Sequence, residues 1–305
     1  MVHIQTREGF RLAVIILTLN QREETLRLLA SLLPQLEGDS RVLVWDNGSS
    51  DDTGEAVTNA FPGVTLQRSH CNLGVAAGRN AAARLAISSW NPCYLLFLDN
   101  DLVLRDGFIS TLRATLDAEM EVGQVQGKLL YLGEPGRIND GGGSRIVFWL
   151  GKTDPVGFKE LDRGQCEQLA PCVSCGGAMM VRRRLFEQLD GFDEVFSPYG
   201  PEDIDFSLRL RALGYQAIYN PAAVALHAAN HTWGKGDVSG DYARSRVTHW
   251  LKFLRRHATP SQRAAFYLAG VPLIGLRMVF RELARGNARA ILGSLKGIVR
   301  HLGAS

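Results

Sequence analysis

Asp99 and Asp101, two carboxylates one residue apart, are the side chains of this 305-residue chain whose spacing most directly suits a chemical role. They follow the apolar run 95–98, where a buried strand would end. Mg²⁺ and Mn²⁺ sites take carboxylate ligands and leave other positions to water and phosphate oxygens. An Asp-x-Asp can also simply begin a turn. The pair predicts a metal–diphosphate site if the fold places it where ligands bind.

Asp46 follows a second apolar run, 42–45, and could accept hydrogen bonds from a nucleobase or a ribose hydroxyl. The alternative is an Asx-turn that leads into the next helix. Asn47, Ser49 and Asp51 are able to cap that turn by themselves. We therefore favour a ligand-binding role for Asp46.

Two basic residues are further candidates. Arg79 lies in the first turns of a helix predicted over 75–88 and could bind a phosphate, or it could form a surface salt bridge. His227 follows the strand-like run 223–226 and could be either a core histidine or a neutral metal ligand. His231 is a weaker candidate of the same kind.

Glu202 and Asp203 form a second acidic pair, directly after Pro201. Proline is favoured as the first residue of a helix, which places both carboxylates near the positive end of the helix dipole. We expect them to stay ionised there, and an ionised carboxylate can deprotonate a hydroxyl. Simple helix-end electrostatics is the alternative.

The elements that must position these residues alternate along the first 130 residues. Continuous apolar runs predict buried strands, and apolar residues spaced three and four apart predict helices. The predicted strands are 12–17, 42–45, 64–66 and 94–98, and the predicted helices are 23–33, 51–60 and 75–88. This pattern indicates an α/β, Rossmann-like, mostly parallel sheet with flanking helices. The loops after its strands share one edge, where ligands of such sheets bind.

The second half of the chain is less regular. Residues 133–159 are rich in glycine and predict a hairpin or a lid, in which 141–143 must be mobile or tightly turned. A strand resumes over 173–181, interrupted by two glycines. The composition changes near residue 241, so we predict a catalytic domain over 1–240 and a basic amphipathic helical extension over 241–305.

The extension differs in charge from the rest of the chain. It holds twelve Lys or Arg and two acidic residues, although the whole chain has a net charge of only +3. We expect breaks in its helices at Pro260, Pro272 and Gly286. Its apolar run 264–276 is too short to span a bilayer. A solvated helix face and binding to an anionic surface are both consistent with this charge.

The five cysteines do not indicate a disulfide framework, because their number is odd. Cys172 and Cys175, with Cys166 nearby, lack a fourth ligand for a zinc site, and we expect small buried thiols in a strand. No secretory signal is recognisable, which favours a cytoplasmic protein.

Seven stretches, in this order, resemble family 2 glycosyltransferases of the GT-A type, in the inverting, non-processive branch that includes rhamnosyltransferase-like members. They are residues 15–20, 45–53, 72–80, 97–101, 176–181, 191–194 and 202–211, and the similarity covers about 11–235. The Gln-x-x-Arg-Trp motif of the processive synthases is not present. The resemblance implies transfer of a hexose or deoxyhexose from a nucleoside diphosphate sugar to a glycan or lipid-linked acceptor, in cell-surface polysaccharide or glycolipid assembly.

The resemblance also implies roles for individual residues. Thr18, Asn20 and Asp46 would bind the nucleotide, Thr18 and Asp46 through its nucleoside. Arg79 would contact the base or the phosphates, and Asp99 the ribose or the metal.

Three more positions complete the implied site. Asp101 and His227 would bind Mg²⁺ or Mn²⁺ at the donor diphosphate. Asp203 would be the general base that deprotonates the acceptor hydroxyl as it attacks the anomeric carbon.

The extension has two competing predictions. It could dock on an anionic membrane that displays a lipid-linked acceptor, on the inner face, because basic amphipathic helices lie in the interface plane. Alternatively, Leu251, Phe253, Tyr267 and Leu268 could form a homodimer contact. We expect no nucleic-acid partner. The rival functions are a nucleotidyltransferase, a non-catalytic sugar-nucleotide-binding protein on a transferase fold, and a donor hydrolase.

Overall fold

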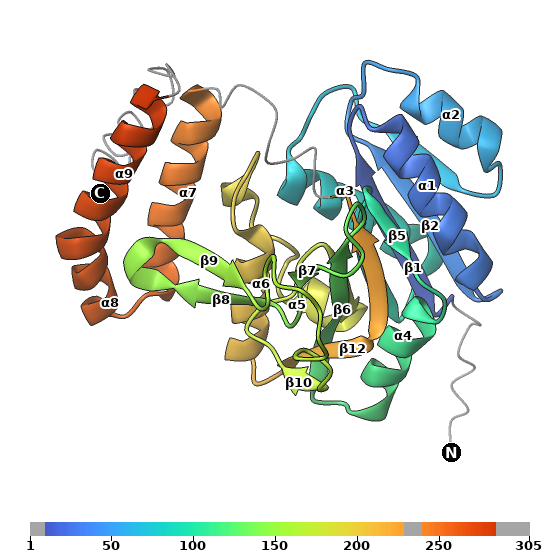
Figure 1. Ribbon diagram of the computed structural model, residues 1–305. Coiled ribbons are helices and arrows are strands. Elements are labelled where there is room, and N and C mark those ends of the chain that lie inside the picture. Colours follow the sequence, from blue (N-terminus) through green and yellow to red (C-terminus); the bar gives the residue numbers. More distant parts are fainter. Residues whose placement is uncertain (1–9, 229–239, 285–305) are drawn as a thin grey trace.

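The structure, a computed structural model, describes residues 10–228 and 240–284. A ten-stranded mixed sheet forms its centre, and helices cover both faces (Figure 1). The strands of this sheet are β1 (Leu12–Thr18), β2 (Ser40–Asp46), β3 (Thr65–Arg68), β4 (Tyr94–Asp99), β5 (Leu102–Leu104), β6 (Val122–Tyr131), β7 (Ile138–Asp140), β10 (Ala170–Pro171), β11 (Ala178–Arg182) and β12 (Gln216–His227).

The N-terminal half confirms the predicted β–α alternation. Its strands run parallel in the order β4-β1-β2-β3. The helices between and after them are α1 (Arg22–Leu32), α2 (Thr53–Ala60), α3 (Val75–Trp90), α4 (Phe108–Ala118), α5 (Arg183–Gln188) and α6 (Glu202–Ala212). Val14 faces the core shared with α1 and α4, and Ile15 faces the core shared with α3, so β1 is buried on both sides. This explains its uninterrupted apolar sequence.

The other half of the sheet mixes strand directions. β11 lies antiparallel between β4 and β6, and β12 runs parallel to β6 and antiparallel to β5. The β12–β5 register pairs His227 with Leu102, the residue directly after Asp101. Strand pairing therefore brings a histidine from far along the chain to the end of β4.

The cysteine prediction was partly wrong. β11 begins at Ala178, so Cys172 and Cys175 are buried in the loop before it rather than in a strand, with their Sγ atoms 3.7 Å apart. Cys71 and Cys93 are exposed. The two glycines at 176 and 177 precede β11, which begins later than predicted because they form part of the loop at the site described below.

The glycine-rich middle forms a hairpin, one of its two predicted forms. Its strands are β8 (Ser144–Val147) and β9 (Lys152–Pro155), joined by the short helix η2 (Phe148–Leu150). The 141–143 segment is tightly turned: Asp140 Oδ1 accepts the backbone N–H groups of Gly142 and Gly143 at 3.0 and 2.7 Å. The hairpin extends from the sheet toward the C-terminal helices (Figure 1).

The C-terminal segment consists of α7 (Gly240–His257), α8 (Pro260–Ala265), the π-helical turn η4 (Phe266–Gly270) and α9 (Val271–Ala284). A capping box at Thr259 begins α8 and confirms the break at Pro260. The expected break at Pro272 was wrong. Pro272 is the second residue of α9 and follows the π-turn, whose altered hydrogen bonding accommodates its missing N–H. Gly286 and His231 lie outside the described residues.

Part of this segment packs into the body of the protein. Leu251 and Phe253 of α7 are 5% and 0% exposed, so the expected dimer contact cannot include them. Tyr267 and Leu268 are 48% and 81% exposed. No helix among residues 10–228 and 240–284 is both long and apolar enough to cross a bilayer.

Candidate active site

The loops after the parallel strands lie together at one edge of the sheet, as the sequence predicts. Asn20 has a positive φ of 54°, and its Oδ1 accepts the Ser50 N–H at 2.7 Å. Its own N–H donates to Ser49 Oγ at 3.0 Å. Asn47 Nδ2 donates to Asn72 Oδ1 at 2.9 Å. Asn20 and Asn47 thus join the loops after β1, β2 and β3.

Thr18 ends β1 and is almost fully buried. Its hydroxyl lies 2.8 Å from that of Thr25 and accepts from Asn100 Nδ2 at 3.1 Å. Asn100 is the residue between Asp99 and Asp101, so this contact fixes the turn that presents both carboxylates. The nucleoside contact expected of Thr18 stays a prediction.

Asp46 is completely buried at the end of β2. Its Oδ1 accepts the Ser49 N–H at 2.7 Å, so Asp46 itself holds the turn that we had assigned to its neighbours. Its Oδ2 lies 3.4 Å from Arg68 Nε and has no hydrogen-bond partner among the described residues. One carboxylate oxygen serves the fold, and the binding of a ligand by the other stays a prediction.

Asp99, Asp101 and His227 form a cluster in which each offers one ligand atom within 4.8 Å of the other two. His227 Nε2 lies 3.0 Å from Asp101 Oδ1, and its Nδ1 lies 2.9 Å from Asn139 Oδ1. A carbonyl acceptor at Nδ1 keeps a proton on that nitrogen, so Nε2, which now pairs with Asp101, is the nitrogen that would bind a metal in its deprotonated form.

The cluster fits a divalent cation. Asp101 Oδ2 is buried and has no hydrogen-bond partner among the described residues, an arrangement that a cation would satisfy. Two carboxylates and one imidazole are a donor set that Mg²⁺ or Mn²⁺ accepts when phosphate oxygens complete the shell. Burial disfavours the charged form of His227, but Asp101, Asp99 and Asp140 outweigh it and raise the histidine pKa.

Arg79 lies between the two acidic groups of the site. Its Nη2 donates to Asp99 Oδ1 at 2.5 Å, and its Nη1 donates to Glu202 Oε1 at 3.4 Å. The side chain is only 9% exposed, so the surface salt bridge considered as an alternative is excluded. Arg79 from α3 therefore links the metal cluster to the start of α6.

Glu202 and Asp203 begin α6, as predicted, but they are not equally ionised. Burial and the neighbouring Asp203 raise the pKa of Glu202 to about 8, so the expectation that it stays ionised was wrong. Burial also raises the pKa of Asp203, to about 6, against the opposing effects of Arg79 and the Ile204 N–H. Desolvation is the stronger effect at this helix start. Asp203 is still mainly ionised at neutral pH.

Two glycines allow these acidic groups to come close. A Cβ at Gly176 would lie 2.5 Å from Asp203 Oδ2, and a Cβ at Gly177 would lie 3.3 Å from Asp99 Oδ2. Gly177 also has a positive φ of 66°. The base candidate and the metal cluster thus border the same short loop.

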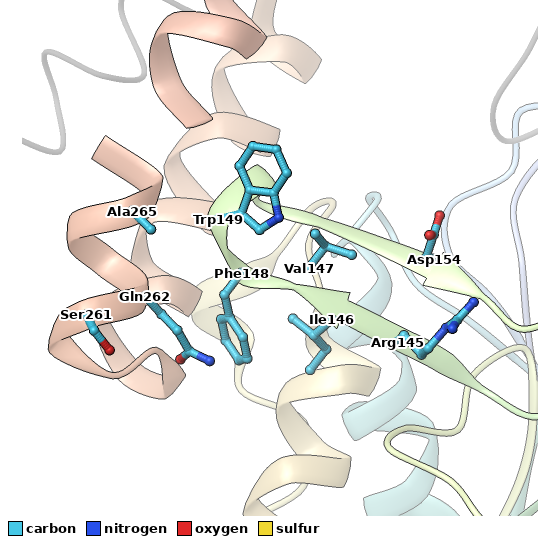
Figure 2. A pocket seen from close by; sticks show the side chains of 9 residues that line it. All are labelled: Arg145, Ile146, Val147, Phe148, Trp149, Asp154, Ser261, Gln262 and Ala265. Atoms are coloured by element: carbon cyan, nitrogen blue, oxygen red, sulfur yellow. The ribbon is translucent and has the colours of Figure 1, made fainter. Parts of the chain in front are cut away.

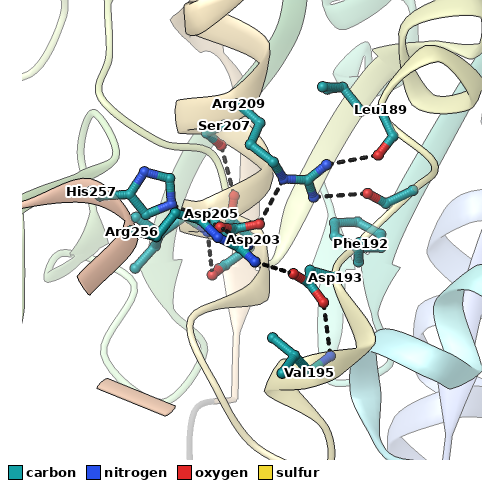
Figure 3. Close-up of polar contacts among 12 residues, drawn as sticks. Leu189, Phe192, Asp193, Val195, Asp203, Asp205, Ser207, Arg209, Arg256 and His257 are labelled. Carbon is teal, nitrogen blue, oxygen red and sulfur yellow. Dashed lines mark hydrogen bonds and ion pairs between the residues drawn. The ribbon is translucent and has the colours of Figure 1, made fainter. Parts of the chain in front are cut away.

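Asp205, one residue beyond Ile204, anchors α6 to the C-terminal segment (Figure 3). This fully buried carboxylate accepts from Arg209 Nε at 2.7 Å and from Arg256 Nη1 at 2.8 Å, and lies 2.7 Å from His257 Nε2. Burial alone would raise its pKa, but the hydrogen bonds from these three residues lower it. Arg256 also donates to Asp193 Oδ2 at 2.6 Å.

Sequence reasoning missed three participants: Asn139, Asp140 and His257. Asn139 and Asp140 come directly before the glycine run, a signal that the sequence does contain. His257 has no comparable signal, because its partner lies 52 residues away.

Comparisons with known proteins agree with this geometry. The model of glycosyl transferase family 2 matches residues 13–190, and that of the N-terminal domain of galactosyltransferase matches 170–232. An N-acetylglucosaminyl-diphospho-decaprenol L-rhamnosyltransferase of Mycobacterium tuberculosis is 27% identical over 259 residues, which are 78% of this chain and 82% of the relative. An uncharacterized glycosyltransferase of Haemophilus influenzae is 26% identical over 65% of this chain and 61% of its own length.

Two solved structures share the fold. GalNAc-T7 with UDP, GalNAc and Mn²⁺ superimposes with a TM-score of 0.67 at 15% identity, over 86% of this chain and 50% of that one. The mannosyltransferase PcManGT from Pyrobaculum calidifontis, in complex with GDP-Man and Mn²⁺, gives a TM-score of 0.57 at 18% identity, over 96% and 87%. The GT-A fold expected from the sequence is confirmed.

Proposed function

The chain belongs to glycosyl transferase family 2, and from this premise we propose that it is a metal-dependent, inverting glycosyltransferase that uses a nucleoside diphosphate sugar. Its activity as a glycosyltransferase follows from the family match and the rhamnosyltransferase relative. The observation that carries the finer proposal is the metal-ligand cluster next to a buried carboxylate at a helix start.

Asp99, Asp101 and His227 would hold the cation, and Arg79 would contribute a positive charge beside it. A bound Mg²⁺ or Mn²⁺ would stabilise negative charge on the diphosphate as it departs. Asp46 Oδ2, which has no hydrogen-bond partner among the described residues, would accept a hydrogen bond from the nucleoside. The Mn²⁺ and nucleotides bound by the two solved neighbours support this arrangement.

Asp203 would act as the general base. Its carboxylate borders the Gly176 loop, and a base with a pKa of about 6 is ionised at neutral pH yet basic enough to accept a hydroxyl proton. The acceptor oxygen then forms a bond to the anomeric carbon while the bond to the diphosphate breaks. A single displacement of this kind inverts the anomeric configuration.

The acceptor is proposed to be lipid-linked, in cell-surface polysaccharide or glycolipid assembly. The M. tuberculosis relative is named for such an acceptor and for L-rhamnose, which makes deoxyhexose donors the first to test. The basic extension, with its exposed Tyr267 and Leu268, would hold the protein at an anionic membrane surface as a peripheral protein.

Asp203→Asn tests the base assignment. We expect turnover to fall roughly 10²–10⁴-fold because the amide cannot accept the proton. The thermal stabilisation by a nucleoside diphosphate with Mn²⁺ should stay near that of the wild type, since the metal cluster is intact. Wild-type turnover in this variant would disprove the role of Asp203. A screen of nucleotide sugars by the same thermal shift identifies the donor.

A further inference from the structure

The β8–β9 hairpin is docked firmly on the C-terminal helices at its tip. A Cβ at Gly270 would lie 1.9 Å from the Trp149 carbonyl oxygen, so only glycine fits where the tip meets η4. Gly151, with a φ of 53°, lies against the ring of Phe266. Close packing of this kind makes the hairpin a fixed wall of the molecule.

The same hairpin also contacts the catalytic helix. Ile146 and Phe148 pack in one cluster with Ile204 and Phe253, and the rings of Phe148 and Phe253 stack at 6.3 Å. Ile204 is the residue directly after Asp203. The hairpin therefore connects the proposed base with the C-terminal helices through continuous side-chain packing.

A cavity of about 660 Å³, broadly open to solvent, lies between the hairpin and α8 (Figure 2). Its wall is mainly apolar on the hairpin side and small or polar on the helix side. The lining residues are Arg145, Ile146, Val147, Phe148, Trp149, Asp154, Ser261, Gln262 and Ala265. Ile146 and Phe148 belong to both the cavity and the cluster around Ile204, so the cavity begins one layer of side chains away from the catalytic helix.

The two ends of the cavity differ in chemistry. Arg145 and Asp154 lie at the sheet end, and Trp149 lies at the tip (Figure 2). Asp154 accepts from Lys152 at 3.1 Å, whereas Arg145 is exposed and has no ion pair within the part of the chain that the structure describes. On η4 and α9, Leu268 and Leu276 are 81% and 58% exposed. The cavity thus has an exposed cation at one end, and the C-terminal segment that borders it carries exposed apolar side chains.

We propose that this cavity binds the isoprenoid chain of a lipid-linked acceptor, with Arg145 binding its phosphate. This inference rests on the proposed function. A sugar joined through diphosphate to an isoprenoid needs a cation for its phosphate and an apolar surface for its chain, and the cavity supplies Arg145 and a mainly apolar wall close to the helix that carries Asp203. A mainly apolar wall beside exposed apolar side chains suits a chain that emerges from a membrane.

The test measures binding of radiolabelled farnesyl diphosphate to the full-length protein by equilibrium dialysis. Chelator is present throughout, so that the diphosphate cannot bind through a metal at Asp99 and Asp101. We expect saturable binding to one site, and weaker binding of inorganic diphosphate, which lacks the chain. Absence of saturable binding would overturn the proposal.

Ala265→Trp fills the cavity from α8. We expect it to raise the Kd for farnesyl diphosphate at least about tenfold, because the isoprene units lose their apolar contacts. Ala264→Trp is the matched control, since Ala264 is an exposed neighbour that does not line the cavity. Equal Kd values for the wild type and Ala265→Trp would overturn the proposal.

Arg145→Ala is the second variant, and it removes the cation on the hairpin side of the cavity. It should weaken binding of farnesyl diphosphate but leave binding of farnesol unchanged. Dihexanoyl phosphatidylglycerol, a membrane-lipid headgroup on short acyl chains, should compete poorly; equal competition would refute an isoprenoid site. Both variants should keep the thermal shift with nucleoside diphosphate and Mn²⁺. If the wild type itself shows no thermal shift with nucleoside diphosphate and Mn²⁺, the result would instead count against the proposed function.

Discussion

At the scale of single residues, the first turn of α6 holds three carboxylates in three different environments. Glu202 is buried beside another acid, and its pKa rises to about 8. Asp203 borders a glycine loop, and its pKa rises to about 6. Asp205 is fully buried, but its three hydrogen-bond partners lower its pKa. A neutral acid, a base and a structural anion thus arise within four residues, because their neighbours differ.

Glu202→Gln should change stability in a pH-dependent way. The folded-state pKa of about 8 exceeds the ordinary value of 4.5, so the stability contributed by neutral Glu202 is present at low pH and is lost as pH rises through about 8. The glutamine remains neutral at every pH. We therefore expect the Tm of the variant minus that of the wild type to increase from pH 5 to pH 9. Each kcal/mol of unfolding free energy that the wild type loses over this range corresponds to about 2–4 °C.

Thermal melts in chelator at pH 5, 7 and 9 measure this advantage. Glu187→Gln is the control, because Glu187 is exposed on α5. A Tm difference between Glu202→Gln and the wild type that does not vary with pH would contradict the raised pKa.

Asp101→Ala tests the metal site. We expect it to weaken nucleoside diphosphate binding when Mn²⁺ is present and to leave binding in chelator unchanged, because the variant removes only a metal ligand. Calorimetric titration under both conditions measures the difference. Asp106→Ala, in the exposed loop five residues later, should behave like the wild type. Equal weakening with and without Mn²⁺ would remove Asp101 from the metal site.

At the scale of elements, α7 holds α6 in place through the contacts of Arg256 and His257 with Asp205. His257→Ala should destabilise the fold by about 1–3 kcal/mol, since a buried carboxylate loses one of its partners. Urea denaturation measures this cost. Arg255→Ala, the exposed neighbour two residues earlier on the same helix, is the control. Equal stability of the two variants would show that the contact of His257 with Asp205 contributes nothing to stability.

The N-terminal elements could be predicted closely from sequence because their signals are local. Strands buried on both faces have continuous apolar runs, and the observed β1, β2 and β4 each extend only slightly beyond the predicted residues. The antiparallel β11 begins later than predicted because Gly176 and Gly177 belong to the loop before it, where Gly177 has a positive φ of 66°. Within 173–177 only Ser174 and Cys175 are buried, and burial in a loop depends on what packs over it, which no local pattern records.

In the candidate site, too, local sequence signals predict some features, and contacts between distant segments determine the others. Asp99, Asp101 and Asp203 could be selected because strand ends and helix starts mark them in the sequence. The pKa difference between Glu202 and Asp203 could not, since it depends on Arg79 and on the desolvation that packing produces. The roles of Asn139 and His257 likewise depend on contacts between distant segments.

At the scale of the whole molecule, basic charge and exposed apolar side chains gather on the C-terminal helices. Tyr267, Leu268 and Leu276 are exposed, and Arg277 lies beside them in sequence. Deleting 241–305, the obvious experiment, would also remove α7 and its contacts with Asp205. Point variants on the exposed face separate membrane binding from folding.

Leu268→Glu combined with Leu276→Glu should reduce cosedimentation with phosphatidylglycerol vesicles at least about tenfold, because two apolar insertions are lost. Wild-type binding should also fall with salt, as the basic residues require. Leu169→Glu is the control, since Leu169 is 61% exposed but lies outside the C-terminal helices. Unchanged cosedimentation of the double variant would leave the membrane proposal without support.

The link between α6 and α7 has a consequence for biosynthesis. The partners of Asp205 on α7 lie 51 and 52 residues downstream, so a ribosome must translate α7 before that carboxylate has all three of its partners. The parallel half of the sheet can form earlier, as N-terminal segments generally do. A nascent chain that stops before residue 256 would contain the strands and loops of the candidate site, but Asp205 on α6 would have only Arg209 of its three partners. Enzymatic competence should therefore appear late in translation, once this segment has left the exit tunnel.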